Sequence, residues 1–164
     1  MQTREVMTEN VQFCAPDTNL AAAIEIMWNS DCGVLPVLEN GKLAGIVTDR
    51  DICIALGTRD CAARDVAVRD VGTTTVHTCQ PDDDVYVALE VMQTARVRRV
   101  PVVDADGNLR GIVSLGDLAN QIERKGDTAL YQELLATLKA VSPQRFRKPA
   151  GSAAAELVSM AAAS

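Results

Sequence analysis

Histidine is nearly absent from this chain, and clustered cysteines are lacking. His77 is the only histidine among 164 residues, and no two of the five cysteines form a Cys-x-x-Cys pair. A zinc site or a histidine-based catalytic triad is therefore not expected. The odd number of cysteines fits free thiols in a reducing compartment.

Clustered cations and long apolar runs are also scarce. Lys and Arg number 16 against 22 Asp and Glu, and the net charge of −6 disfavours a nucleic-acid or anionic-membrane partner. The longest apolar stretches are interrupted by Glu25 and Glu90 and are too short to cross a bilayer. Residues 1–5 carry no apolar signal core, so we expect a cytoplasmic protein. The length suits one domain with one hydrophobic core.

The chain does contain an internal repeat. Leu-Pro-Val at 35–37 and Gly-Ile-Val-Thr-Asp-Arg-Asp at 45–51 are echoed by Val-Pro-Val at 100–102 and Gly-Ile-Val-Ser-Leu-Gly-Asp at 111–117. The second copy has one extra residue in the turn between its two motifs. An insertion at a turn between matched segments is typical of a structural repeat. A repeat this small must pack against its copy, which creates paired clefts.

Each copy has the pattern of a β-α-β-β-α unit, which predicts an α+β fold. The expected divisions are 1–60 for the first motif, 61–126 for the second, and 127–164 for a C-terminal helical extension with an Ala-rich tail. Because a helix connects the first two strands of each copy, those strands should run parallel, and the next two should form a hairpin.

Turn and capping residues set the expected element bounds. In the first copy we expect a strand over 11–15, a helix over 20–29 capped by Asp17 or Asn19, strands over 34–38 and 43–47, and a helix over 48–56 that Gly57 ends. In the second copy the corresponding elements are 75–79, 84–95, 99–103, 109–113 and 114–125, with Gly126 as the stop. A helical turn near 68–71 should mirror the amphipathic segment 3–9.

The first helix of each copy is apolar almost all round, over residues 20–28 and 85–92. A helix on the surface of a monomer usually carries one apolar stripe. The other copy covers one side, and a second subunit is the natural cover for the remaining side, so we predict a homodimer.

Beyond Gly126 the pattern predicts an amphipathic helix over 128–141, with one face formed by Leu130, Leu134, Leu135 and Leu138. A basic patch at 145–148 lies between two prolines, and it has too few cations to bind DNA in so acidic a chain. The Ala-rich segment 152–164 is expected to be a solvated tail, with a further helix as the alternative.

The repeated element with chemical character is Gly-x-x-(Thr/Ser)-x-x-Asp, at each predicted strand-to-helix junction. It contains Thr48 and Asp51 in the first copy, and Ser114 and Asp117 in the second. A hydroxyl N-cap with an acid three positions later approaches a capping box, which would stabilise any helix start. Alternatively, free amides at the helix start attract a phosphate while the carboxylate accepts hydrogen bonds from a ribose. Its occurrence in two copies favours ligand binding.

Together these motifs resemble a tandem pair of CBS (cystathionine β-synthase) domains, known as a Bateman module. The resemblance rests on the Leu-Pro-Val and Val-Pro-Val strands, the Asn-Gly and Asp-Gly turns and the two Gly-Ile-Val motifs, and it covers roughly residues 3–124. The chain resembles the small stand-alone bacterial members of that family, which lack an attached enzyme or channel. The resemblance implies two sheets about a pseudo-two-fold axis, disc-like dimers, and two clefts that commonly hold AMP, ADP or ATP. Some members hold S-adenosylmethionine or NAD-type ligands.

The resemblance also implies roles for individual residues. Asp51 and Asp117 would bind ribose, while Thr48 and Ser114 would contact phosphate or ribose. Two segments would offer backbone groups to the adenine edge, and they include Cys14, Ala15, His77 and Cys79. The adenine face would lie against apolar residues that are more often simple core, namely Val34, Leu35, Pro36, Val100 and Pro101.

Two of these residues have a simpler interpretation. Cys14 and Cys79 hold matching positions, and they are better explained as small, inert strand residues than as redox-sensitive thiols.

The copies differ where a phosphate would bind. The second copy has Arg98 and Arg99 before its Val-Pro-Val strand, where the first has Gly33 and Val34. Arginine pairs bind phosphate well, and the resemblance places a phosphate contact here. The alternative is a strand edge kept soluble by charge. Arg50 is a further candidate cation.

We therefore expect two unequal clefts, with tighter binding at the one that Arg98 and Arg99 reach. Whether that is the cleft of Asp117 or of Asp51 stays open at this stage.

The sequence predicts a regulatory module that senses adenine nucleotides, requires no cofactor and is not an enzyme, since no nucleophile–base pair emerges. The sequence does not identify a regulated partner protein. The alternative is a ligand-independent dimerisation scaffold.

Overall fold

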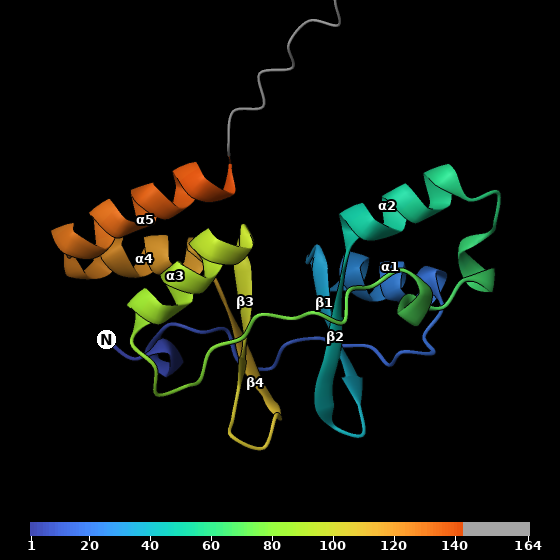
Figure 1. Ribbon diagram of the computed structural model, residues 1–164, viewed down its shortest axis with the longest axis horizontal. Coiled ribbons are helices and arrows are strands. Elements are labelled where there is room, and N and C mark those ends of the chain that lie inside the picture. The colour runs from blue at the N-terminus through green and yellow to red at the C-terminus, as the bar shows by residue number, and fades with distance from the viewer. Residues whose placement is uncertain (143–164) are drawn as a thin grey trace, which may run out of the picture.

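A computed structural model of the chain describes residues 1–142 and shows two similar halves side by side (Figure 1). The elements in chain order are α1 (Leu20–Asn29), β1 (Val34–Glu39), β2 (Lys42–Thr48), α2 (Asp49–Thr58), α3 (Val85–Ala95), β3 (Arg99–Val103), β4 (Leu109–Ser114), α4 (Leu115–Lys125) and α5 (Thr128–Val141). Short 3-10 turns lie at Thr3–Glu5, Ala63–Asp65 and Val68–Asp70. The predictions for the basic patch and the Ala-rich segment concern residues outside the described part.

Each half is built around one antiparallel hairpin, β1 with β2 and β3 with β4. Both hairpins are irregular at the same place, after Val37 and after Val102. Asn40 and Gly41 both have positive φ, 51° and 81°, as a two-residue turn between twisted strands requires. The mixed helix and strand architecture confirms the predicted α+β fold class.

The predicted strands over 11–15 and 75–79 are each reduced to a single parallel bridge, Cys14 with Val37 and Cys79 with Val102. Their predicted direction is confirmed, but their predicted length is wrong. Cys14 N donates to Pro36 O at 3.0 Å, and Cys14 O accepts from Leu38 N at 2.8 Å. The next donor in a parallel ladder would be the nitrogen of Pro16, which carries no hydrogen. Pro81 has the same position in the second half.

The helix ends are partly as predicted. Gly126 has φ 66° and ends α4, as a left-handed C-terminal glycine should. The expectation that Gly57 ends α2 is wrong, because α2 continues to Thr58 and Gly57 does not adopt positive φ. Thr58 Oγ1 donates to Ile54 O at 2.7 Å, which satisfies one carbonyl of the last turn.

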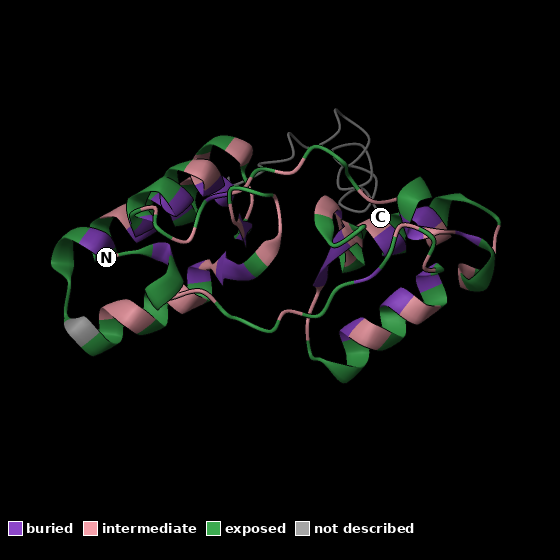
Figure 2. Cartoon of the chain, turned by 90° about the horizontal axis from the view of Figure 1, so that it is seen from below, coloured by how far each residue is buried: buried purple, intermediate pink, exposed green. Residues whose placement is uncertain are grey.

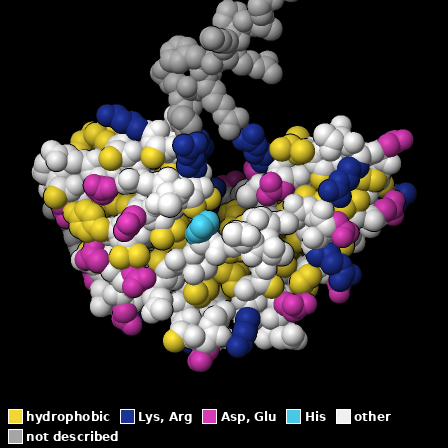
Figure 3. All heavy atoms as spheres, viewed as in Figure 1, with side chains coloured by type: hydrophobic (Ala, Val, Ile, Leu, Met, Phe, Trp, Pro, Cys, Tyr) yellow, Lys and Arg dark blue, Asp and Glu magenta, His cyan; other side chains and the backbone are white. Residues whose placement is uncertain are grey.

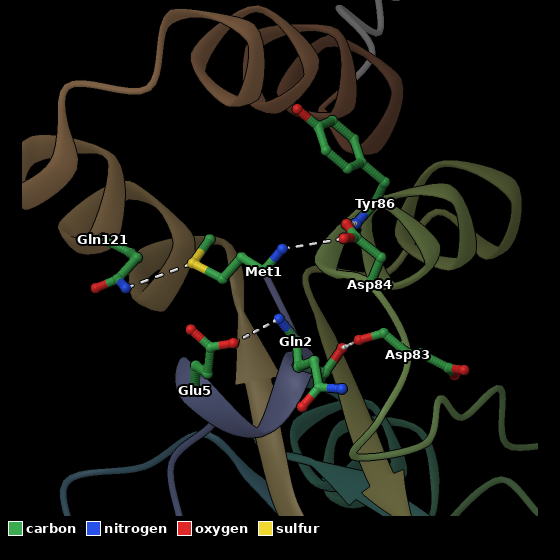
Figure 4. Close-up of polar contacts among 8 residues, drawn as sticks. Met1, Gln2, Glu5, Asp83, Asp84, Tyr86 and Gln121 are labelled. Carbon is green, nitrogen blue, oxygen red and sulfur yellow. Dashed lines mark hydrogen bonds and ion pairs between the residues drawn. The ribbon is translucent and has the colours of Figure 1, made fainter.

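The two halves exchange their leading segments. Residues 1–8 precede the first copy but pack on the second, where the Met1 amino group lies 3.0 Å from Asp84 Oδ2 (Figure 4). Thr3 N also donates to Asp83 O at 2.8 Å. Conversely, the segment between the copies packs on the first half, where Leu20 N donates to Val66 O at 2.9 Å. The boundary near residue 60 therefore divides the repeat in the sequence. In the structure, each half packs against the segment that precedes the other half in the sequence.

Residues 1–142 form two hydrophobic cores, where one was predicted. The first half buries Leu20, Ala23, Leu35, Val47 and Ile52. The second buries Leu89, Met92, Val100, Val113 and Leu118, together with residues of α5. Buried residues gather on the inner sides of the helices within each half (Figure 2). The exchanged segments add apolar surface to both halves, and α5 adds more to the second half. A separate core therefore forms in each half.

Helix α5 packs against α3 and α4. Its buried residues follow helical spacing along one stripe and are Leu130, Leu134, Thr137 and Val141. Gln93 of α3 donates to Glu133 at 2.6 Å and to Thr137 Oγ1 at 2.9 Å. The prediction that Leu135 and Leu138 share the buried face is wrong, because both lie on the solvent side of this stripe. Within residues 1–142, no helix has both the length and the apolarity needed to span a membrane.

Candidate functional site

Both Gly-x-x-(Thr/Ser)-x-x-Asp motifs form complete capping boxes with nearly identical geometry. Thr48 Oγ1 lies 2.7 Å from Asp51 Oδ2, and Thr48 N donates to the same oxygen at 3.0 Å. Ser114 Oγ and N lie 2.7 Å and 2.8 Å from Asp117 Oδ2. In both pairs the Asp amide donates back to the hydroxyl at 3.2 Å. The motif therefore stabilises a helix start in each half, which is the first of the two sequence interpretations.

The capping box leaves one carboxylate oxygen of each aspartate outside it. Asp117 Oδ1 accepts a long hydrogen bond of 3.4 Å from Thr8 Oγ1. No residue in the range 1–142 donates a hydrogen bond to Asp51 Oδ1. These oxygens remain able to accept stronger hydrogen bonds from a bound hydroxyl.

A groove of about 290 Å³ opens beside Asp117, between the two halves. Its lining includes residues of both halves and of the N-terminal lead, among them Thr8, Asp31, Val34, Arg99, Ser114 and Asp117. The volume is at the lower end of the range for small-molecule sites. Arg99 lines the groove of Asp117, so of the two arginines before β3 at least this one lies at the cleft of Asp117.

Arg98 and Arg50 are placed differently. An Arg98 guanidinium nitrogen donates to Ser142 Oγ at 3.2 Å, so this side chain reaches the end of α5. Arg50 is exposed on the first turn of α2. Lys and Arg side chains flank the notch where the two halves meet (Figure 3), and Arg99 is the one cation among the described residues that line the groove of Asp117.

Several predicted contact residues are buried. Cys14, Cys79, Pro36 and Pro101 lie beneath the surface, and the backbone N and O of Cys14 already pair with β1. Burial raises the pKa of the Cys14 thiol to about 11. Burial and the nearby charge of Asp83 raise the pKa of Cys79 to about 11. Both thiols are therefore neutral at physiological pH, as expected for inert structural cysteines.

Leu35 and Val100, which were predicted on the adenine face, are fully buried, whereas Ala15 and His77 are exposed. The amide of Ala15 donates to Thr18 Oγ1 at 3.0 Å, which closes the turn before α1.

Close backbone contacts explain why each motif begins with a glycine. A Cβ on Gly111 would lie 2.7 Å from Thr8 O, and one on Gly45 would lie 2.9 Å from Thr73 O. The backbone of an exchanged lead crosses β4 or β2 at these points, through the bridges of Thr8 with Ile112 and of Thr73 with Ile46. The close approach brings Thr8 to Asp117, so the glycine helps to shape the groove.

Sequence reasoning missed Thr8 and Asp31. Asp31 lies in the turn after α1 and has φ 48°. Arg96 has the matching place after α3, with φ 55°. Aligning the copies through their helices would have shown this pair, because both need a left-handed conformation where the helix ends.

Comparison with known proteins identifies the family. The family model for the CBS domain matches residues 4–58 and 68–124. The chain is 34% identical over 125 residues to the CBS domain-containing protein YhcV of Bacillus subtilis, covering 74% of this chain and 86% of that protein. It is 32% identical over 131 residues to YlbB of the same organism, covering 77% and 87%. The chain belongs to the CBS-domain family and contains two tandem motifs.

Solved structures of CBS pairs share the fold. The CBS domain pair of MJ0100, in complex with 5-methylthioadenosine and S-adenosyl-L-methionine, superposes with a TM-score of 0.68 at 24% identity and covers 76% of this chain and 98% of that one. CBSX2 in complex with AMP gives a TM-score of 0.66 at 24% identity, covering 77% and 98%.

Enzymes also match the chain, but only over a small part of their length. For example, the chain is 35% identical over 115 residues to inosine-5'-monophosphate dehydrogenase of Methanocaldococcus jannaschii, which covers 70% of this chain and 22% of the enzyme. Within residues 1–142, no three His, Cys, Asp or Glu side chains are grouped to hold a metal ion.

Proposed function

We propose that the protein is a regulatory module that binds an adenine nucleotide, AMP, ADP or ATP, in the clefts between its CBS motifs and is not itself an enzyme. One observation carries this proposal: the helix start at Ser114, the carboxylate of Asp117 and the residue Arg99 line one groove. A nucleotide needs a hydroxyl acceptor and an anion site only a few ångströms apart. The complexes of CBSX2 with AMP and of MJ0100 with two adenosine derivatives support the ligand class.

The proposed pose follows from the groups that line the groove. A ribose hydroxyl would donate to Asp117 Oδ1 and replace the long hydrogen bond from Thr8. A phosphate would approach the amide of Gly116 in the first turn of α4 and the guanidinium of Arg99, because the Leu115 and Asp117 amides already donate to Arg98 O and Ser114 Oγ. Val34 and Ile112 offer apolar surface for the adenine. Thr48 and Asp51 would serve a second cleft in the same way.

Titration calorimetry of the full chain with AMP, ADP, ATP and adenosine tests this proposal. We expect binding by the wild type and at least tenfold weaker binding by Asp117→Ala, since a charged hydrogen bond is worth about 1.5–3 kcal/mol. Asp106→Ala is the matched control, because Asp106 lies in the exposed turn after β3 and outside the groove. Absence of heat with all four ligands would contradict the proposal. Sustained ATP turnover that Asp117→Ala abolishes would contradict a role confined to binding.

We further propose that the protein forms a homodimer through the face of α1 and α2. A groove of about 480 Å³ lies between these helices, and Trp28 beside it is 83% exposed. In the second half, α5 covers the corresponding helices α3 and α4. A protruding indole next to an apolar hollow is self-complementary, so a two-fold axis would place each Trp28 in its partner's groove. This surface is also what favours the alternative function, a ligand-independent dimerisation scaffold.

Light scattering tests the assembly. We expect a dimeric mass for the wild type and a monomeric mass for Trp28→Lys. Tyr131→Lys is the matched control, because Tyr131 is an aromatic residue of α5 that is 49% exposed and lies outside the α1–α2 groove. A monomeric wild type at micromolar concentration would rule out this interface.

A further inference from the structure

Asp31 gives the groove of Asp117 an excess of negative charge. The charged residues of the lining are Asp31, Asp117 and Arg99, two carboxylates against one guanidinium. The carboxylate of Asp117 is engaged by the Ser114 capping box, whereas no hydrogen bond to the Asp31 carboxylate occurs within the described residues. A ligand that adds several negative charges would therefore meet repulsion from Asp31.

The other half carries the opposite charge at the matching place. Arg96 follows α3 as Asp31 follows α1, and both have left-handed backbones with φ 55° and 48°. The two halves repeat each other around the clefts, since Thr8 bridges Ile112 in one and Thr73 bridges Ile46 in the other. The turn after α1 thus presents an acid to the groove of Asp117, whereas the matching turn after α3 carries a base.

We propose that Asp31 makes the cleft of Asp117 selective for adenosine ligands of low negative charge. The chemical class assigned to the Asp117 cleft is a nucleoside with at most one phosphate or with a cationic substituent. This inference rests on the proposed nucleotide binding and adds which ligand this cleft selects.

Asp31→Asn isolates the charge. Asparagine also tolerates positive φ, so the turn after α1 is kept while the negative charge is removed. ATP carries about four negative charges and adenosine none. For partly exposed groups a few ångströms apart, we expect the variant to strengthen ATP binding about tenfold at low salt, AMP about threefold, and adenosine by less than twofold. The gain for ATP should shrink at high salt because the charges are then screened.

The experiment is titration calorimetry of the full chain with adenosine, AMP and magnesium-free ATP. Asp51→Ala serves as the background, so that the cleft of Asp117 dominates the signal. Asp106→Asn is the matched control, since it removes the same charge outside the groove. The expected result is that Asp31→Asn, and not Asp106→Asn, raises the ratio of ATP to adenosine affinity about fivefold or more.

The possible failures are distinguishable. Binding of all three ligands with an unchanged affinity ratio in Asp31→Asn overturns the charge selectivity and leaves the nucleotide site intact. Absence of binding by the wild type overturns the proposed function itself and this inference with it. Asp31 also borders the α1–α2 groove, so light scattering accompanies the titration. An affinity change that follows a change in mass would assign the effect to assembly and contradict the proposal.

Discussion

The docking of α5 on the second half is tested by two identical substitutions on one helix. Leu134 is 5% exposed and belongs to the second core, whereas Leu138 is 39% exposed, one turn further along. Leu→Ala at either position makes the same chemical change and the same small change in helix propensity. Any difference in stability therefore reports burial against α3 and α4.

The expected magnitudes follow from burial. Removing a buried leucine side chain costs the lost transfer free energy and leaves a cavity, so Leu134→Ala should lower the free energy of unfolding by about 3 kcal/mol. Leu138 keeps much of its side chain in water, so its substitution should cost about 1 kcal/mol or less. For a chain of this size, about 3 °C in Tm corresponds to each kcal/mol, which gives losses of about 9 °C and about 3 °C or less.

Urea unfolding followed by far-UV circular dichroism measures both variants. Equal destabilisation of the two, or a larger loss for Leu138→Ala, would refute the assigned face of α5. Light scattering provides a control, because it shows whether Leu138 is covered by a second subunit.

Three further predictions concern local chemistry. The free energy of unfolding of the wild type should fall as pH rises from 9 towards 11. The reason is that the folded pKa of Cys14 and Cys79 is about 11, whereas the unfolded thiols ionise first, near 9. In a pH series of urea midpoints, Cys→Ala at both sites should flatten this fall. Gly111→Ala should lower the free energy of unfolding by about 2 kcal/mol, since its Cβ would lie 2.7 Å from a backbone oxygen. Gly57→Ala in α2 places its Cβ in open space and should raise the free energy of unfolding by up to about 1 kcal/mol in the same assay. The amide of Tyr86 and the N-terminal amino group lower the pKa of Asp84, so its stabilising effect should be present above the unfolded pKa and be lost as pH falls through the folded pKa. Asp84→Asn should reduce this acid dependence in a pH series of Tm values.

Local signals were enough to predict much of the fold. Asn19 caps α1 and Ser114 caps α4 by accepting amide hydrogen bonds, and Gly126 ends α4 in the left-handed region. These features depend on residues within one helical turn, so the sequence shows them directly. The same holds for the Asn-Gly turn between β1 and β2.

Features that depend on distant contacts were not predictable. The bridge of Cys14 stays a single bridge because Pro16 cannot donate to β1, and the exchange of leads pairs Thr8 with a strand more than a hundred residues away. The groove of Asp117 combines residues from both halves, so the place of Asp31 beside Asp117 could be recognised only once the halves were placed together. For α5, the choice between two leucine faces depends on the surface that α3 and α4 present.

A crystal structure of the full chain grown with AMP would test the proposed nucleotide binding. We expect density for the nucleotide in at least one cleft, with a ribose hydroxyl within hydrogen-bonding distance of the Asp117 or Asp51 carboxylate. Two clefts that remain empty, or that are filled by the protein's own side chains at saturating AMP, would contradict it.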